Sequence, residues 1–252
     1  VVPPSLRGVM QNYRVNYLTP LRAALGVVER LLASKSYDEI DFNKVPSVAM
    51  LRYARKCFPS HMPERFRQWQ LDVMSGKARI NTGAVDPYQV VERLLTESDV
   101  PEGELATLEA FYATSIAKLR AKGTSGKTCV IADTSGSMHG TPMAVSVAMA
   151  IWFSSCADEE WRDVFYSFNT VPEEVSLKGL ETLQERVNKA KAAPWGGNTD
   201  LLATFRLILA KAAAYGYTAD KMPTRLVIIS DMQFDQACED GFTNLEMARQ
   251  LY

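Results

Sequence analysis

Cysteine and histidine are scarce in this sequence, with four cysteines and two histidines among 252 residues. The cysteines stand far apart, at Cys57, Cys129, Cys156 and Cys238, and none belongs to a Cys-x-x-Cys pair. This spacing predicts neither a disulfide framework nor a cysteine zinc site. Because disulfides are rare in reducing compartments, we expect an intracellular, cytoplasmic protein.

Long hydrophobic runs are also missing. No apolar stretch approaches the roughly 20 residues that a membrane-spanning helix needs, and the first ten residues, VVPPSLRGVM, lack the basic start and apolar centre of a secretory signal. We therefore expect no membrane partner. Hydrophobic residues make up 47% of the chain and charged residues 23%, which is typical of a globular protein and argues against long disorder or a fibrous class.

The two halves of the chain differ in charge, although the whole carries a net charge of only −1. Residues 1–122 hold 17 basic and 13 acidic side chains, a net of +4, whereas residues 123–252 hold 11 and 16, a net of −5. This asymmetry indicates two regions with different partners. We expect a helical N-terminal region over residues 1–122 and a second domain over residues 125–252.

The N-terminal region has the apolar periodicity of helices. Leu18, Leu21, Leu25, Val28, Leu31 and Leu32 recur every three or four residues, which predicts one apolar helix face. Further helices are expected at residues 46–57, 63–74, 88–95 and 102–122, where prolines and glycines mark the starts and ends.

The C-terminal region alternates between two kinds of segment. Short apolar, β-branched runs predict strands at 128–132, 164–168, 174–177 and 225–230. Helices are expected between and after them, at 142–157, 180–190, 200–215 and 244–252. Strands that alternate with helices predict an α/β fold with a doubly wound, mainly parallel sheet. Ligand sites in such sheets lie beyond the carboxyl ends of the strands.

Oxygen-bearing side chains follow the expected strands at these positions. The first strand runs into Asp133, with Ser135 and Ser137 in the same short loop; Thr199 ends a Gly-rich turn; and Asp231 follows the strand 225–230. Carboxylate and hydroxyl oxygens are hard ligands that suit Mg²⁺, or Mn²⁺, better than Zn²⁺. The five residues are therefore a candidate metal site.

The order and spacing of these motifs resemble the metal-ion-dependent adhesion site of a von Willebrand factor A (vWA) domain, over about residues 125–252. The resemblance implies that Ser135 and Ser137 bind the metal directly and that Thr199 binds it directly or through water. It also implies that Asp133 and Asp231 act largely through water. In that family a carboxylate of a partner protein often fills the open metal position, which is a binding mechanism rather than catalysis.

Each residue taken alone has a simpler interpretation. Asp133 and Asp231 could be turn or cap residues, Ser135 and Ser137 loop hydroxyls, and Thr199 the cap of the helix that follows it. These separate interpretations do not explain why all five residues fall at adjacent strand ends.

Other polar residues near the motifs have their own interpretations. We expect Asp200 to cap a helix and Asp235 to be a solvated loop carboxylate. His139 is interpreted as a loop residue, and a Ser-His-Asp hydrolase that would use it is a lesser alternative.

A basic segment of the helical region carries the second candidate site. Its basic residues are Arg52, Arg55, Lys56, Arg65, Arg67, Lys77 and Arg79, with Tyr53, Phe58, Phe66 and Trp69 between them. Cations and stackable rings together can bind RNA. The alternative is that the charges form a solvated helix face and the rings belong to the core, and Phe66 and Trp69 share one helix face.

The helical region also resembles known families. The segments VPSVAMLRYARKCF and DVMSGKARINTGAVDPYQVV are similar to an uncharacterised family of helical-plus-vWA proteins found in viruses and cells. A helical region before a vWA domain is distantly similar to the Ro autoantigen (TROVE) proteins, in which a helical ring binds RNA. The helical region here is shorter than a complete ring of that type.

Three functional hypotheses follow. The first is a non-enzymatic protein that binds a protein partner at a Mg²⁺-loaded vWA site. The second is a Ro-like RNA-binding protein that uses the basic segment, and the third is a metal-dependent hydrolase.

The end of the chain yields a further prediction. The resemblance implies six strands in the order 3-2-1-4-5-6, and four are found. The strand 225–230 would then be an open edge although its residues Leu226–Ile229 are apolar on both faces. We expect the missing strands to come from a longer chain or from another subunit.

Overall fold

The computed structural model describes residues 5–97, 99–123, 126–168, 171–194, 200–231 and 246. The chain divides into two compact units, residues 1–84 and residues 85–252. No helix of the described residues is long and apolar enough to cross a membrane.

The first unit is helical. Its elements are α1 (Leu6–Tyr13), a π-helical turn η1 (Arg14–Leu18), α2 (Thr19–Ala24), α3 (Val28–Ala33), short 3-10 turns η2 (Tyr37–Glu39) and η3 (Phe42–Lys44), α4 (Ser47–Ala54), α5 (Cys57–His61) and α6 (Pro63–Met74). Its core is an aromatic cluster in which the rings of Phe58 and Phe66 pack on Phe42 and those of Phe66 and Trp69 stack at a centroid distance of 5.7 Å.

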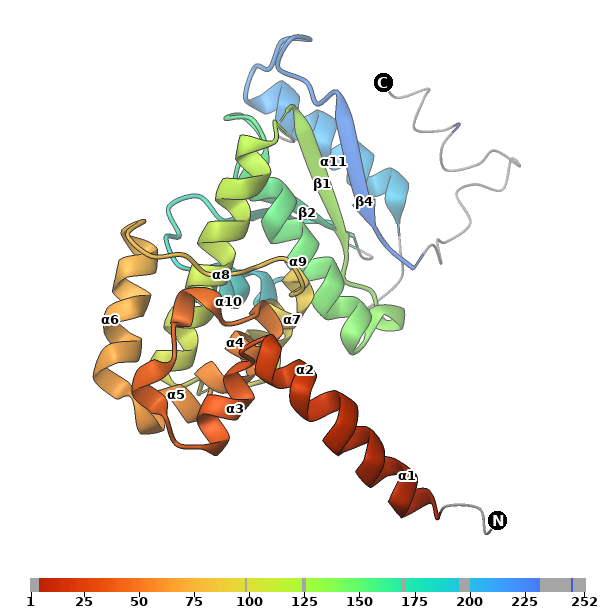
Figure 1. Cartoon of the computed structure of the whole chain (residues 1–252). Helices are drawn as coiled ribbons and strands as arrows, with labels where there is room; N and C mark the ends of the chain where they lie inside the picture. Colours follow the sequence, from red (N-terminus) through yellow and green to blue (C-terminus); the bar gives the residue numbers. More distant parts are fainter. Residues whose placement is uncertain are drawn as a thin grey trace. The chain divides into compact units, whose positions relative to one another are not determined.

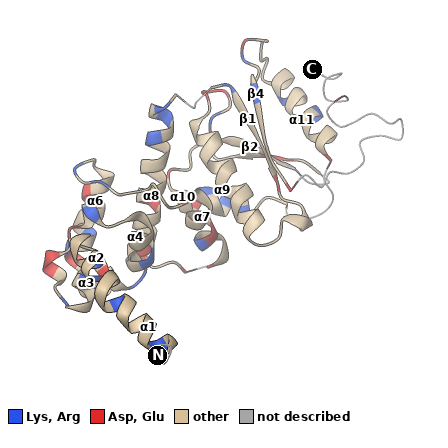
Figure 2. Ribbon diagram, turned by 45° about the vertical axis from the view of Figure 1, so that its right-hand side comes forward, with Lys and Arg blue, Asp and Glu red and all other residues tan. Residues whose placement is uncertain are grey.

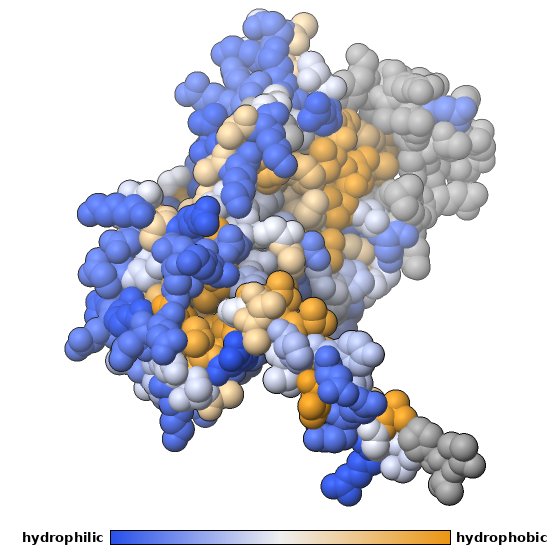
Figure 3. All heavy atoms as spheres, in the orientation of Figure 1, coloured by the Kyte–Doolittle hydropathy of each residue, from blue (hydrophilic) through white to orange (hydrophobic). Residues whose placement is uncertain are grey.

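The predicted apolar helix face over residues 18–32 is wrong. Gly26 adopts a positive φ of 58° and separates α2 from α3, so the spacing does not continue along one helix. Leu21 and Leu25 are 56% and 75% exposed, and apolar patches are visible along this helical segment (Figure 3). Of the six residues that form the predicted face, all of which the structure describes, only Val28 is buried. Sequence periodicity shows which face a helix could bury, but not whether another element covers that face.

The second unit contains the sheet. Its helices are α7 (Pro87–Thr96), α8 (Glu102–Ala121), the 3-10 turn η4 (Gly136–Met138), α9 (Thr141–Cys156), α10 (Leu183–Lys191) and α11 (Leu201–Ala214). Its strands are β1 (Thr128–Asp133), β2 (Val164–Phe168), β3 (Glu174–Ser176) and β4 (Arg225–Ile229). The order is β3-β2-β1-β4, with β1 parallel to β2 and β4 and with β3 antiparallel to β2. The α/β class and the mainly parallel sheet are confirmed.

The two faces of the sheet are covered by different helices (Figure 1). Cys129 and Ile131 of β1 pack with Phe205 and Ile208 of α11. Because side chains alternate along a strand, Val130 and Ala132 face the other way, toward α9, which contacts β1. Helices α7, α8 and α10 pack on α9 and form a further layer beyond it.

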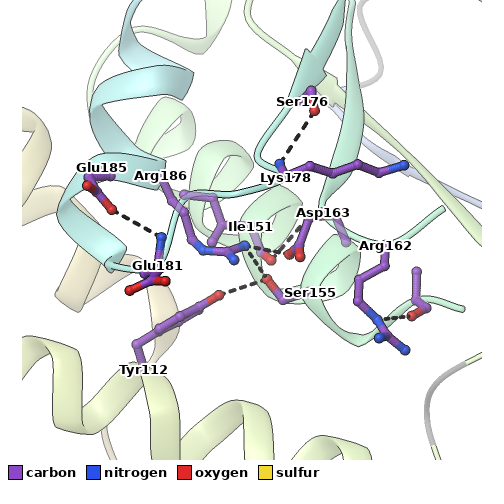
Figure 4. Close-up of polar contacts among 12 residues, drawn as sticks. Tyr112, Ile151, Ser155, Arg162, Asp163, Ser176, Lys178, Glu181, Glu185 and Arg186 are labelled. Atoms are coloured by element: carbon purple, nitrogen blue, oxygen red, sulfur yellow. Dashed lines mark hydrogen bonds and ion pairs between the residues drawn. The ribbon is translucent and has the colours of Figure 1, made fainter. Parts of the chain in front are cut away.

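Polar contacts fix helix α8 to the α/β layers (Figure 4). The Tyr112 and Ser155 hydroxyls are 2.8 Å apart, and Arg120 donates to the Ser155 carbonyl at 2.7 Å. Arg186 of α10 forms an ion pair with Asp163 and lies over the Tyr112 ring. The unit that holds the sheet therefore includes α7 and α8, upstream of residue 125.

Local sequence signals account for several helix starts. Asp86 and Gln89 form a capping box at α7, with Pro87 in the first turn, and Thr182 and Glu185 form another at α10.

Strand β4 is the edge strand of the sheet in the described residues, and the Ile228 side chain on it is 38% exposed. The predicted helix 244–252 lies outside the described residues except for residue 246, as does any strand after residue 231.

Candidate metal site

The candidate site begins where β1 ends. Asp133 is the last residue of β1 and its side chain is completely buried. Its Oδ1 accepts a hydrogen bond from the Ser135 backbone N–H at 2.9 Å, which closes a tight turn after the strand. Residues 136–138 then form a 3-10 turn that leads into α9. A buried strand thus places a carboxylate and two serines in one loop.

The two serine hydroxyls lie side by side. Ser135 Oγ and Ser137 Oγ are 3.0 Å apart; Ser135 is buried and Ser137 is exposed. Oxygen ligands of Mg²⁺ lie about 2.0–2.1 Å from the ion in octahedral geometry, so two adjacent ligands are about 3 Å apart. The hydroxyl pair fits two adjacent positions around such an ion.

The ends of β1 and β4 meet at this loop. The parallel register aligns Ala132 with Ile229, so the next residues on each strand, Asp133 and Ser230, are neighbours. Ser230 Oγ donates to Asp133 Oδ2 at 2.6 Å. Asp231 follows Ser230 directly and is exposed. Of the five predicted residues, the structure thus brings Asp133, Ser135 and Ser137 together in one loop. Asp231 is the residue directly after Ser230, which contacts Asp133.

Thr199 lies outside the described residues. On either side of it, Asp200 caps α11 by accepting from the Ala203 N–H at 2.8 Å, which confirms its predicted role, and Pro194 accepts from Thr134 at 3.3 Å. This last contact links the loop after β1 to the segment that leads to Thr199. Asp235 also lies outside the described residues.

Two residues at the site were missed by the sequence analysis. Ser230 holds the Asp133 carboxylate, and Ser146 of α9 donates to the Asp133 backbone carbonyl at 2.8 Å. Ser230 stands directly before Asp231, where a strand-end position was already expected. Ser146 carried no signal, because a serine within a helix of small residues is indistinguishable from a packing residue until the helix is placed on the sheet.

The site is rich in hydroxyls and poor in charge. Among the described residues, no three side chains of the His, Cys, Asp and Glu types group as metal ligands do. The candidate site is of another kind, because most of its ligand oxygens belong to serine and threonine hydroxyls.

The basic segment of the first unit has a different character. Its seven basic side chains are all exposed, and α6 carries Arg65 and Arg67 together with the acidic residues Glu64 and Asp72 (Figure 2). The Arg65 guanidinium donates to the backbone carbonyls of Tyr37 and Ile40 at 2.8 and 3.0 Å. Phe66 and Trp69 are buried, which confirms their interpretation as core residues.

Comparisons with known proteins give similarity without a function. Residues 4–125 match the family model Domain of unknown function (DUF2828), and residues 127–250 match Domain of unknown function (DUF7788). An uncharacterised protein of Acanthamoeba polyphaga mimivirus is 30% identical over 252 residues, which covers 94% of this chain and 43% of that protein. The chain therefore spans less than half the length of this relative. No solved structure matches the chain.

Proposed function

We propose that this chain is a non-enzymatic interaction protein that binds a protein partner through a vWA-like site loaded with Mg²⁺ or Mn²⁺. The observation that carries the proposal is the strand-end cluster of Asp133, Ser135 and Ser137. A buried carboxylate holds a loop in which two hydroxyl oxygens are 3.0 Å apart. The order of the motifs, with Thr199 and Asp231 after them, supports the vWA assignment.

The residues of the site have distinct tasks in this proposal. Ser135 and Ser137 hold the ion through their hydroxyls, Thr199 holds it directly or through water, and Asp133 and Asp231 act through water. When bound, the ion would act as a Lewis acid, with a coordination position open to an oxygen ligand of a partner.

The charge of this residue set determines the class of partner. Serine and threonine hydroxyls are neutral ligands, so they leave the charge of the ion largely uncompensated. A carboxylate is a hard oxygen donor with the opposite charge, and it therefore suits the open position. An Asp or Glu side chain of a partner protein is the proposed ligand.

Direct measurement of metal binding tests this proposal. Calorimetry with Mg²⁺ and Mn²⁺ on the 252-residue chain should show binding that Asp133→Ala removes, with an unchanged far-UV spectrum. Asp220→Ala is the matched control, because Asp220 precedes β4 and its backbone carbonyl contacts Lys127 just before β1, at the opposite end of these strands. Equal metal affinity in the wild type and in Asp133→Ala would refute the site.

RNA binding through the basic segment is the second candidate function. The observation that favours it is the exposure of all seven basic side chains. The burial of Phe66 and Trp69 removes base stacking on these rings, and the Arg65 guanidinium is already engaged by the protein backbone. This candidate therefore depends on phosphate contacts from the remaining cations, which are strongly salt-dependent.

A further inference from the structure

The contact between Ser230 and Asp133 joins two strands at the candidate metal site. The hydroxyl of Ser230, directly after β4, donates to Oδ2 of Asp133, the last residue of β1, at 2.6 Å. The contact follows from the parallel register, which pairs Ala132 with Ile229 and so brings the next residues level. It spans 97 positions of sequence, so it forms only when the sheet is assembled.

The Asp133 carboxylate is oriented by protein donors. Its side chain is completely buried, and each of its oxygens has its own donor: the Ser135 N–H at 2.9 Å for Oδ1 and the Ser230 hydroxyl for Oδ2. A carboxylate oxygen has two lone pairs. Each oxygen of Asp133 thus retains acceptor capacity after these contacts are made.

We propose that Ser230 is a positioning residue for metal binding, an inference that rests on the proposed function. The Ser230 hydroxyl fixes the rotation of the Asp133 carboxylate, so that the remaining lone pairs are held ready for water bound to the ion. Outer-shell hydrogen bonds of this kind orient the groups that they contact and tune metal affinity. One strand end then supplies both Asp231 and the residue that orients Asp133.

Mn²⁺ binding to Ser230 variants, measured by electron paramagnetic resonance and by calorimetry, tests the inference. Ser230→Ala should weaken Mn²⁺ affinity by about tenfold, at the lower end of the effects known for outer-shell partners. Ser230→Thr keeps a hydroxyl on the same Cβ and should restore affinity close to that of the wild type. A purely structural role would not predict rescue that depends on the hydroxyl.

Ser146→Ala is the matched control. Ser146 is buried, whereas Ser230 is partly buried, and Ser146 also donates its hydroxyl to Asp133, at 2.8 Å, but to the backbone carbonyl rather than to the carboxylate. It should lower the unfolding temperature of the metal-free protein and leave the Mn²⁺ affinity nearly unchanged.

The outcomes separate the inference from the proposed function. If the wild type binds Mn²⁺, Asp133→Ala does not, and Ser230→Ala binds as tightly as the wild type, the inference is overturned while the proposed site stands. Equal losses of affinity in Ser230→Ala and Ser146→Ala would also overturn it. If the wild type itself does not bind Mn²⁺, the proposed function fails and the positioning role fails with it.

Discussion

The ion pair between Arg93 and Glu104 should be among the most costly polar contacts to break. Glu104 lies on α8 with its side chain 4% exposed, and Arg93 lies on α7 with its side chain 14% exposed. The guanidinium donates twice, from Nε to Oε1 at 2.7 Å and from Nη2 to Oε2 at 3.2 Å. The pair therefore fixes α7 against α8 in the layer outside α9.

The structure sets the size of the effect. Removing one partner of a buried ion pair costs about 3–5 kcal/mol of unfolding free energy, because the other charge remains buried. Arg93 also forms an ion pair with Glu97, which is 38% exposed. That second carboxylate partly compensates the arginine, so we expect Glu104→Gln to cost about 3 kcal/mol, near the low end of the range.

Urea unfolding of the 252-residue chain, followed by circular dichroism, measures this cost. Glu97→Gln is the control and should cost no more than about 1 kcal/mol, because its carboxylate is partly solvated. The double replacement Arg93→Met with Glu104→Leu removes both charges and should recover most of the loss. If Glu104→Gln costs no more than Glu97→Gln, the reasoning from burial is refuted.

Three further predictions concern metal, pH and RNA. Mg²⁺ at 100 times its Kd should raise the unfolding free energy by about 2.7 kcal/mol in thermal or urea unfolding. EDTA should reverse this gain. A similar gain in Asp133→Ala would contradict the assignment of the metal site. Burial raises the pKa of Glu109, although it accepts from the N–H groups of Leu183 and Gln184 at the start of α10. A raised carboxyl pKa means that the folded state holds its proton more tightly, so stability falls as pH rises above about 4.3, through the folded pKa. The unfolding free energy of Glu109→Gln should therefore fall less over that range, and parallel pH profiles would count against this assignment. For the second candidate function, replacing Arg67, Lys77 and Arg79 with Ala should weaken retention of single-stranded RNA and lower its salt slope by about 2; no retention by the starting chain would eliminate that candidate.

Local signals in the sequence determined much of the second unit. The apolar run at 164–168 became β2 with the predicted bounds, and the strand predicted at 128–132 became β1 with one residue more. Strand periodicity and caps act within a few residues, so they can be recognised without the rest of the fold. The strand order came from the resemblance to vWA domains rather than from local signals, and the structure has that order for the four strands described.

The apolar spacing of the first unit was less informative. A three- and four-residue pattern shows that a helix can bury one face, but it does not say whether another element covers that face. Leu21 and Leu25 obey the pattern and are exposed, whereas Val28, on the next helix, is buried. Gly26 makes the difference locally, because its positive φ separates the two helices.

The sequence by itself determined which residues form the candidate metal site after β1, because Asp133, Ser135 and Ser137 are so close in sequence that they fall in one loop. Only the tertiary structure decided what orients them. Ser230 reaches Asp133 because two parallel strands pair in one register, and Ser146 reaches it because α9 packs on that face of the sheet. Hydrogen bonds between residues far apart in sequence depend on the packing of whole elements, and no short motif records them.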